Sequence, residues 1–176
     1  MKKLLLAGVL LPTLAMAKVP DSGFYADLGS GVSSINYLTT SASSWMARLD
    51  GGYNVNKYVG FQVGINDFFS TQMTNSTYGS YNLSGYGYDL SIIPNIPFGF
   101  NAPINVFARI GLGYDAMSAS AGSQNSTVDV LGIGLRYDVS AHLAVSAQWI
   151  GRGIIVQPSP SSYSQNNFLA NIGLYF

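Results

Sequence analysis

Apolar and polar side chains alternate with a period of two along most of the chain, the pattern of β-strands with two unlike faces. The clearest example is residues 51–69, GGYNVNKYVGFQVGINDFF. Phe61, Val63 and Ile65 share one parity, and glycine and polar residues occupy the other. Residues 54–57, between the two alternating halves, are of the types that favour tight turns. The stretch therefore predicts a β-hairpin.

The same alternation recurs along the rest of the chain and predicts eight strands. Besides the two strands of the hairpin, these are residues 23–33, 83–93, 104–116, 127–138, a segment around 143–149, and 168–176. Residues 34–44, 70–82, 117–126 and 151–167 are rich in Ser, Thr, Asn, Gly or Pro and are predicted long loops. The proline-rich residues 94–103 are predicted to be a further connection. Long loops thus alternate mostly with short turns.

The distribution of charge indicates which face points outward. Asp27, Arg48, Asp50, Asp89, Arg109, Asp115, Arg136 and Asp138 all lie on the glycine-rich parity, whereas the bulky apolar parity is nearly free of charge. Its exceptions, Asp67 and Asp129, lie at predicted strand ends. A soluble barrel needs polar groups outside, whereas a membrane barrel has an apolar exterior and strands of about 9–11 residues. We predict an all-β, transmembrane, eight-stranded, antiparallel up-and-down barrel. Asp89, Arg109 and Arg136 pointing outward would contradict it.

The N-terminus has the features of a signal peptide. Lys2 and Lys3 precede an apolar run, and Ala15, Met16 and Ala17 form a small-residue cleavage site. We expect residues 1–17 to be the signal peptide and residues 18–176 to be the barrel domain. That mature chain has six Lys and Arg against eight Asp, a net charge of −2, which argues against a nucleic-acid-binding protein. Cysteine is absent from the sequence, so disulfide bonds are excluded.

Aromatic residues near the predicted strand ends are expected to form girdles at the two membrane interfaces. They are Tyr25, Trp45, Tyr53, Tyr58, Tyr114, Tyr137, Trp149, Phe168 and Phe176.

Several segments resemble the membrane domain of the OmpA family of small outer-membrane barrels. GGYNVNKYVGFQVG (residues 51–64), VFARIGLGY (106–114) and GIGLRYDVSAHLAVSAQW (132–149) resemble its strands, and the terminal NIGLYF resembles its last-strand signal. The resemblance implies a monomeric protein of the outer membrane that contacts lipid and lipopolysaccharide. It also implies that the assembly machinery recognises the C-terminal strand through Phe176.

The candidate site is a polar network inside the barrel, formed by Asp27, Arg48, Asp50, Gln62, Asp89, Arg109, Arg136 and Gln148. Asp27 with Arg48, and Asp89 with Arg109, could form ion pairs that fill the lumen. The alternative is a narrow porin that conducts small ions. Eight strands enclose little free space, which favours the filled lumen.

The sequence offers little for catalysis or cofactors. The one histidine, His142, has only Ser140 as a nearby hydroxyl, in a predicted turn, so a lipid A-modifying enzyme is disfavoured. One histidine without cysteine does not make a metal cluster, and no cofactor is expected. The predicted loops suggest adhesion or contact with a host or surface ligand, because loops on a rigid scaffold often bind partners. We therefore predict a structural and surface protein without catalysis.

Overall fold

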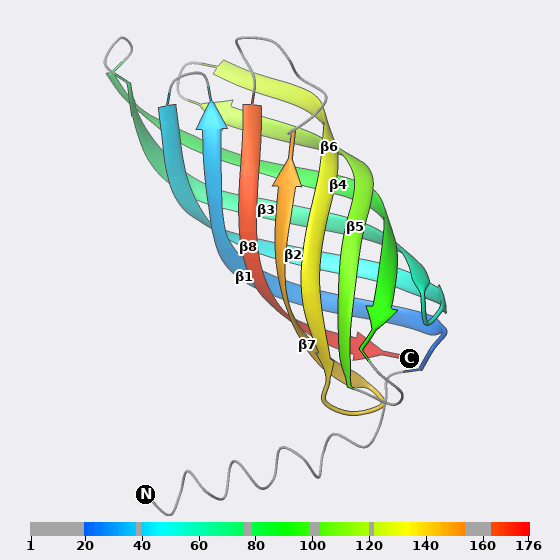
Figure 1. Cartoon of the computed structure of the whole chain (residues 1–176). Coiled ribbons are helices and arrows are strands. Elements are labelled where there is room, and N and C mark those ends of the chain that lie inside the picture. Colours follow the sequence, from blue (N-terminus) through cyan, green and yellow to red (C-terminus); the bar gives the residue numbers. More distant parts are fainter. Residues whose placement is uncertain (1–19, 38–39, 76–78, 99–102, 120–121, 154–162) are drawn as a thin grey trace, which may run out of the picture.

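The chain folds into a closed barrel of antiparallel β-strands (Figure 1). The computed structural model describes residues 20–37, 40–75, 79–98, 103–119, 122–153 and 163–176. Eight strands of these described residues pair in chain order, and the last pairs with the first: β1 (Gly23–Tyr37), β2 (Thr40–Asn56), β3 (Val59–Asn75), β4 (Gly79–Pro97), β5 (Ile104–Ala119), β6 (Gly122–Asp138), β7 (Leu143–Arg152) and β8 (Tyr163–Tyr175). The predicted fold class is confirmed.

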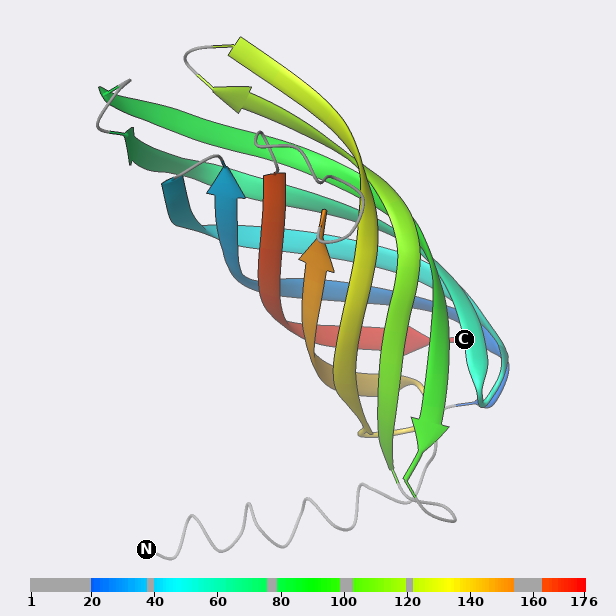
Figure 2. The ribbon, with the colours of Figure 1, turned by 45° about the horizontal axis from the view of Figure 1, so that its top comes forward.

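The strands are longer than predicted at one end of the barrel. β1 and β2 pair as far as Tyr37 and Thr40, and the β3–β4 and β5–β6 hairpins are extended in the same way. The prediction of long loops at 34–44, 70–82 and 117–126 is therefore wrong. In Figures 1 and 2, β3 to β6 rise beyond the ends of β1, β2 and β8. Outside a membrane both faces of a strand can meet water, so these extensions lack the apolar alternation.

The connection predicted at residues 94–103 begins later in the structure than the sequence indicates. β4 continues through Pro94, which lies opposite Val59 of β3, and ends at Pro97. Proline lacks an N–H donor, but the chain keeps its course because the backbone N–H of Asn95 donates to the carbonyl of Tyr58 at 2.7 Å.

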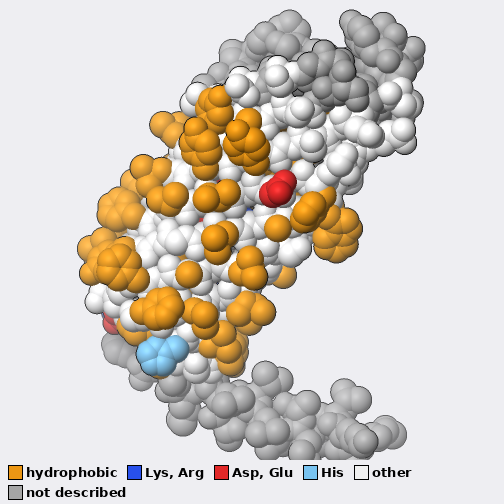
Figure 3. Space-filling view, turned by 180° about the vertical axis from the view of Figure 1, so that it is seen from behind, with side chains coloured by type: hydrophobic (Ala, Val, Ile, Leu, Met, Phe, Trp, Pro, Cys, Tyr) orange, Lys and Arg blue, Asp and Glu red, His pale blue; other side chains and the backbone are white. Residues whose placement is uncertain are grey.

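The outer surface of the wall is apolar, as predicted. Leu28 of β1, Leu90 of β4 and Leu112 of β5 are 65%, 62% and 64% exposed. In contrast, Asp89 and Arg109 are buried inside. Figure 3 shows hydrophobic side chains spread over the wall, below a paler end that carries few of them. The arrangement matches a barrel whose solvent is hydrocarbon around its middle.

One residue of the expected aromatic girdles is misassigned. Tyr25 is buried in the interior, because it shares the inward parity of Asp27, and its ring stacks on Tyr175 with centroids 5.4 Å apart. Of the other expected girdle residues, Trp45, Tyr53, Tyr58, Phe168 and Phe176 are exposed.

The expected signal peptide, residues 1–17, lies outside the described residues. No helix in the described part of the chain is both long and apolar enough to cross a membrane.

Candidate functional site

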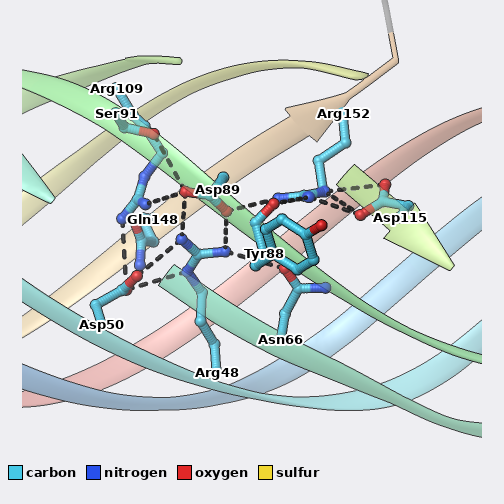
Figure 4. A network of polar contacts seen from close by, with 10 residues as sticks. All are labelled: Arg48, Asp50, Asn66, Tyr88, Asp89, Ser91, Arg109, Asp115, Gln148 and Arg152. Atoms are coloured by element: carbon cyan, nitrogen blue, oxygen red, sulfur yellow. Dashed lines mark hydrogen bonds and ion pairs between the residues drawn. The ribbon is translucent and has the colours of Figure 1, made fainter. Parts of the chain in front are cut away.

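A network of buried ion pairs occupies the middle of the barrel (Figure 4). On β2, Arg48 and Asp50 are two residues apart and both point inward, so Arg48 Nη2 lies 2.7 Å from Asp50 Oδ1. Arg48 also reaches β4, where its Nη1 and Nη2 donate to the two carboxylate oxygens of Asp89 at 2.8 and 2.9 Å. This bidentate contact is the strongest geometry available to an arginine and a carboxylate.

Asp89 is the residue that joins most members of the network. Besides Arg48 it lies 3.4 Å from Nη1 of Arg109 on β5 and 2.6 Å from Nη1 of Arg152 on β7. Arg152 continues to Asp115 of β5, with Nη2 2.6 Å from Oδ1. The six charged residues, three Arg and three Asp, thus neutralise one another in a place without access to solvent.

Glycines on the facing strands make room for these large side chains. Gly64 of β3 lies opposite Asp50, and a Cβ there would overlap the guanidinium of Arg48. Gly113 of β5 lies opposite Asp89, and its Cβ would come within 2.6 Å of Nη2 of Arg152. The inward glycines of the sequence therefore fit the charged network, because a narrow barrel cannot hold a large side chain at every inward position.

A second polar layer lies toward the short turns, the periplasmic end expected for this type of barrel. Arg136 of β6 donates from Nε to Asp138 at 3.0 Å and from Nη1 to the hydroxyl of Tyr175 at 3.3 Å. The hydroxyl of Tyr25 donates to Oε1 of Gln62 at 3.2 Å. The cavity between these side chains has a volume of about 20 Å³. That volume is close to that of one water molecule.

Toward the opposite, extracellular end, apolar side chains point into the barrel. Met46 is the next inward-pointing residue after Arg48 toward the extracellular end of β2, and Phe68 is the next one after Asn66 toward the same end of β3. They belong to a buried cluster of Ile35, Met46, Phe68, Leu83, Val128, Val130, Ile150 and Leu169. This part of the lumen is mixed, because the buried polar residues Ser33, Gln165 and Asn167 point inward beside Ile35 and Ile150.

The predicted site residues all lie in or next to this interior. Arg48, Asp50, Gln62, Asp89, Arg109 and Gln148 are buried, and Asp27 and Arg136 are half-buried. Gln148 accepts a hydrogen bond from Nη2 of Arg109 at 3.2 Å. Phe176 lies elsewhere: its side chain is 70% exposed, and its backbone N–H donates to the carbonyl of Phe24.

The expected pairing of Asp27 with Arg48 is wrong. Asp27 lies opposite Asp50 on β2, and Arg48 lies opposite Gly29, so the two side chains start from different rungs of the ladder. Arg48 instead extends across the lumen to β4. The expected partners Asp89 and Arg109 do lie within 3.4 Å of each other.

Sequence reasoning missed two members of the network. Arg152 was expected in a loop but ends β7, where it is fully buried. Arg152 shares the inward parity of Ser146 and Gln148, and this parity is the sequence signal that indicates its position inside the barrel. Asp115 also has the inward parity but is not among the predicted site residues.

The residues considered for catalysis lie apart from the network. His142, in the turn between β6 and β7, lies with Nδ1 2.9 Å from the carbonyl oxygen of Tyr175. Ser140 accepts a hydrogen bond from the backbone N–H of His142 at 3.3 Å, so the hydroxyl stabilises the turn. Among the described residues, no group of three His, Cys, Asp or Glu is placed to hold a metal ion.

A closed barrel with an apolar wall and an ionic interior is the architecture of bacterial outer-membrane proteins. The family model described as the outer membrane protein beta-barrel domain matches residues 4–176. The chain belongs to this family and is an outer-membrane protein.

Solved structures of small outer-membrane barrels have the same fold. Neisserial surface protein A has a TM-score of 0.70 and 19% identity, covering 88% of this chain and 98% of that one. Ail, the attachment invasion locus protein of Yersinia pestis, was solved with the heparin analogue sucrose octasulfate; the TM-score is 0.63, with 13% identity over 89% and 99% of the chains. The N-terminal barrel domain of Pseudomonas aeruginosa OprF gives 0.57 and 15%, over 88% and 99%. No curated protein matches the sequence.

Proposed function

We propose that this protein is a structural and surface protein of the outer membrane, a barrel with a closed lumen and no catalytic activity. The ion network carries this proposal. Arg48, Arg109 and Arg152 converge on Asp89 from three different strands, and all four are almost fully buried. Ions would have to displace these contacts to pass, and breaking a buried ion pair costs about 3–5 kcal/mol.

The layers on either side support the same proposal. The cavity beside the network, on the periplasmic side, holds about 20 Å³. On the extracellular side the lumen is lined largely by the buried apolar cluster, whose side chains do not replace the water of an ion. The alternative of a narrow porin requires all three layers to open.

Conductance measurements on the purified protein in planar bilayers test this function. We expect a quiet baseline from the wild-type barrel, whereas a large porin added afterwards to the same bilayer should give steady current and so verify the membrane. Steady openings of the wild-type protein would overturn the closed lumen and establish the porin alternative.

The proposed absence of catalysis rests on the environment of His142. A serine nucleophile needs a base within hydrogen-bonding distance of its hydroxyl. Ser140 bonds to backbone and not to the imidazole, and the ring contacts the carbonyl of Tyr175. Mass spectrometry of lipid A from cells that express the protein should therefore show unchanged acyl chains. A protein-dependent loss or gain of an acyl chain would contradict the proposal.

We further propose that the extracellular ends of β3 to β6 form the surface that contacts a host or surface ligand. These strands extend past the others (Figure 2). The extracellular ends of these strands are rich in Ser, Thr, Asn and Gln. The four arginines of the sequence point into the lumen instead. Lysine is confined to residues 2, 3, 18 and 57. The chemistry therefore suits an uncharged, hydrogen-bonding ligand, and does not suit a polyanion such as the one bound to Ail.

Shortening the hairpins tests this contact. Gln72 and Asn82 are paired, as are Met117 and Gln124, so residues 73–81 and 118–123 can each be replaced by a two-residue Asn-Gly turn. We expect a non-adherent laboratory strain to attach to host cells when it displays the wild-type protein but not the shortened one. Equal attachment by both would remove the adhesion proposal and leave the closed lumen untouched.

A further inference from the structure

The C-terminal strand extends beyond the ladder that it shares with β7, at the end of the barrel that carries the short turns (Figure 1). The last pair of that ladder is Leu143 with Leu174, so Tyr175 lies past the start of β7. On the other side the strand keeps its partner, because the N–H of Phe176 donates to the carbonyl of Phe24 at 2.9 Å. Successive residues of a strand direct their N–H and C=O groups to opposite sides. Both backbone groups of Tyr175 therefore face the turn that precedes β7.

One residue of that turn, His142, contacts both of these groups. Its backbone carbonyl accepts a hydrogen bond from the N–H of Tyr175 at 3.0 Å, and its ring nitrogen Nδ1 lies 2.9 Å from the carbonyl oxygen of Tyr175. A carbonyl oxygen has no proton to give, so Nδ1 must carry the hydrogen and act as the donor. The main chain and the side chain of one residue thus satisfy the donor and the acceptor at the end of β8.

The shape of the turn explains why a side chain is needed there. The N–H groups of Val139 and Ser140 both donate to the carbonyl of Leu143, at 2.8 and 3.0 Å, and close the turn. The backbone N–H of His142 donates to the hydroxyl of Ser140 at 3.3 Å. In a regular antiparallel ladder that N–H would instead bond to the carbonyl of Tyr175. The imidazole supplies the donor in its place.

The side chain of Tyr175 is held from the lumen at the same time. The residue is 5% exposed, and its ring stacks on Tyr25 with centroids 5.4 Å apart. The guanidinium of Arg136 lies over the same ring, 5.2 Å from its centroid. Stacking and cation–π contacts depend on the position of the ring, and this position follows from the backbone that carries it. Fixing the backbone of Tyr175 therefore also fixes a side chain of the periplasmic lumen.

We propose that His142 is a latch: its two contacts with the backbone of Tyr175 hold the end of the C-terminal strand and complete the barrel at its periplasmic end. The latch joins β8 to the turn between β6 and β7, so it forms only when β7 and β8 lie side by side. It also occupies backbone groups of NIGLYF, residues 171–176, the segment for which we predict recognition by the assembly machinery. The folded barrel thus withdraws the end of this strand from pairing with any other strand on that side.

The tautomer of the imidazole tests the latch in the unaltered protein. His142 is the one histidine of the sequence, so protein without a histidine tag gives a single imidazole signal. Nitrogen-15 spectra of the folded barrel in detergent micelles distinguish a neutral ring protonated at Nδ1 from one protonated at Nε2. In mildly alkaline buffer, where histidine is ordinarily neutral, we expect the Nδ1–H form. The Nε2–H form would overturn the proposal, because an unprotonated Nδ1 cannot bond to a carbonyl oxygen.

Three variants separate the latch from the rest of the turn. His142→Phe keeps an aromatic ring without a donor, whereas His142→Asn places an amide N–H where Nδ1 lies. Ser140→Ala removes the other side-chain hydrogen bond of the turn and leaves the imidazole unchanged. Hydrogen exchange of the Tyr175 amide, followed by NMR in the same micelles, reports local opening of the strand end. We expect exchange about three- to tenfold faster in His142→Phe, the effect of losing one hydrogen bond, and near the wild-type rate in the other two variants.

Two results of the exchange measurement would overturn the latch. One is an unchanged rate in His142→Phe, and the other is an equal acceleration in Ser140→Ala, which would assign the effect to the turn as a whole. The amide of Ala170, in the middle of β8, is the internal reference and should exchange equally in all four proteins. Gel mobility before and after heating verifies that each barrel is folded; if His142→Phe does not fold, the tautomer of the wild-type ring decides.

Discussion

Replacing Asp89 by asparagine should be among the most destabilising single changes in the lumen. Both carboxylate oxygens are in use: Arg48 donates to each of them at 2.8 and 2.9 Å, Arg152 lies 2.6 Å away and Arg109 3.4 Å away. Asparagine has nearly the same shape but no charge. It leaves three arginines facing two aspartates, and one guanidinium loses its counter-charge in a buried place.

Loss of one partner from a buried ion pair costs about 3–5 kcal/mol. With a urea dependence of about 2 kcal/mol per molar, the unfolding midpoint of Asp89→Asn should fall by roughly 2 M. Urea titration in lipid vesicles, followed by tryptophan fluorescence, measures the shift. Asp67→Asn is the matched control, because that carboxylate is exposed on the wall and should cost less than about 1 kcal/mol. Equal losses for the two variants would refute the role assigned to Asp89.

Three further changes test other parts of the structure. Gly64→Ala should destabilise the barrel by about 1–3 kcal/mol, because the new methyl group overlaps a guanidinium. Gly51→Ala is the control and should be nearly neutral in the same urea titration, because its Cβ would have nothing within 4 Å. A larger loss of stability for Gly51→Ala than for Gly64→Ala would refute the packing argument. Tyr25→Phe should cost about 1 kcal/mol by removing the hydrogen bond to Gln62, and no change in midpoint would show that this bond is not stabilising. Phe176→Ala should leave the urea midpoint of the refolded protein nearly unchanged, since the side chain is 70% exposed, yet reduce the amount assembled in the outer membrane of cells; undiminished assembly would remove its role as a signal.

The membrane-spanning part of the fold could be predicted because lipid imposes a strict rule on each strand. One face must be apolar, so the parity of Leu90 and Leu112 fixes the direction of Asp89 and Arg109. This requirement for one apolar face does not apply to the parts of the strands beyond the membrane surface. Ser70 and Gln72 of β3 and Ser80 and Asn82 of β4 are polar and exposed, so this part of the hairpin leaves no apolar alternation in the sequence and resembles a loop.

The candidate site could be predicted as a set of inward positions, but not as a set of contacts. Parity places Asp27 and Arg48 on one face, whereas the register decides that Asp27 lies opposite Asp50. Arginine side chains also reach across the lumen, so Arg48 finds Asp89 two strands away. Such contacts depend on the diameter of the barrel and on glycines such as Gly64, which no local pattern specifies.

The ion pairs of Figure 4 also have a consequence for the way the wall closes. They connect β2, β5 and β7 to Asp89 on β4. In chain order β2 is next to the first strand and β7 is next to the last, so strands near both ends of the chain are held to a central strand. The junction between β1 and β8, where the first strand meets the last, is formed by ladder pairing along Tyr25–Tyr37 and Tyr163–Tyr175. That seam can part while every ion pair drawn in the figure stays intact. An open-edged intermediate with an ordered interior is therefore compatible with this structure, and the interior need not wait for the two terminal strands to pair.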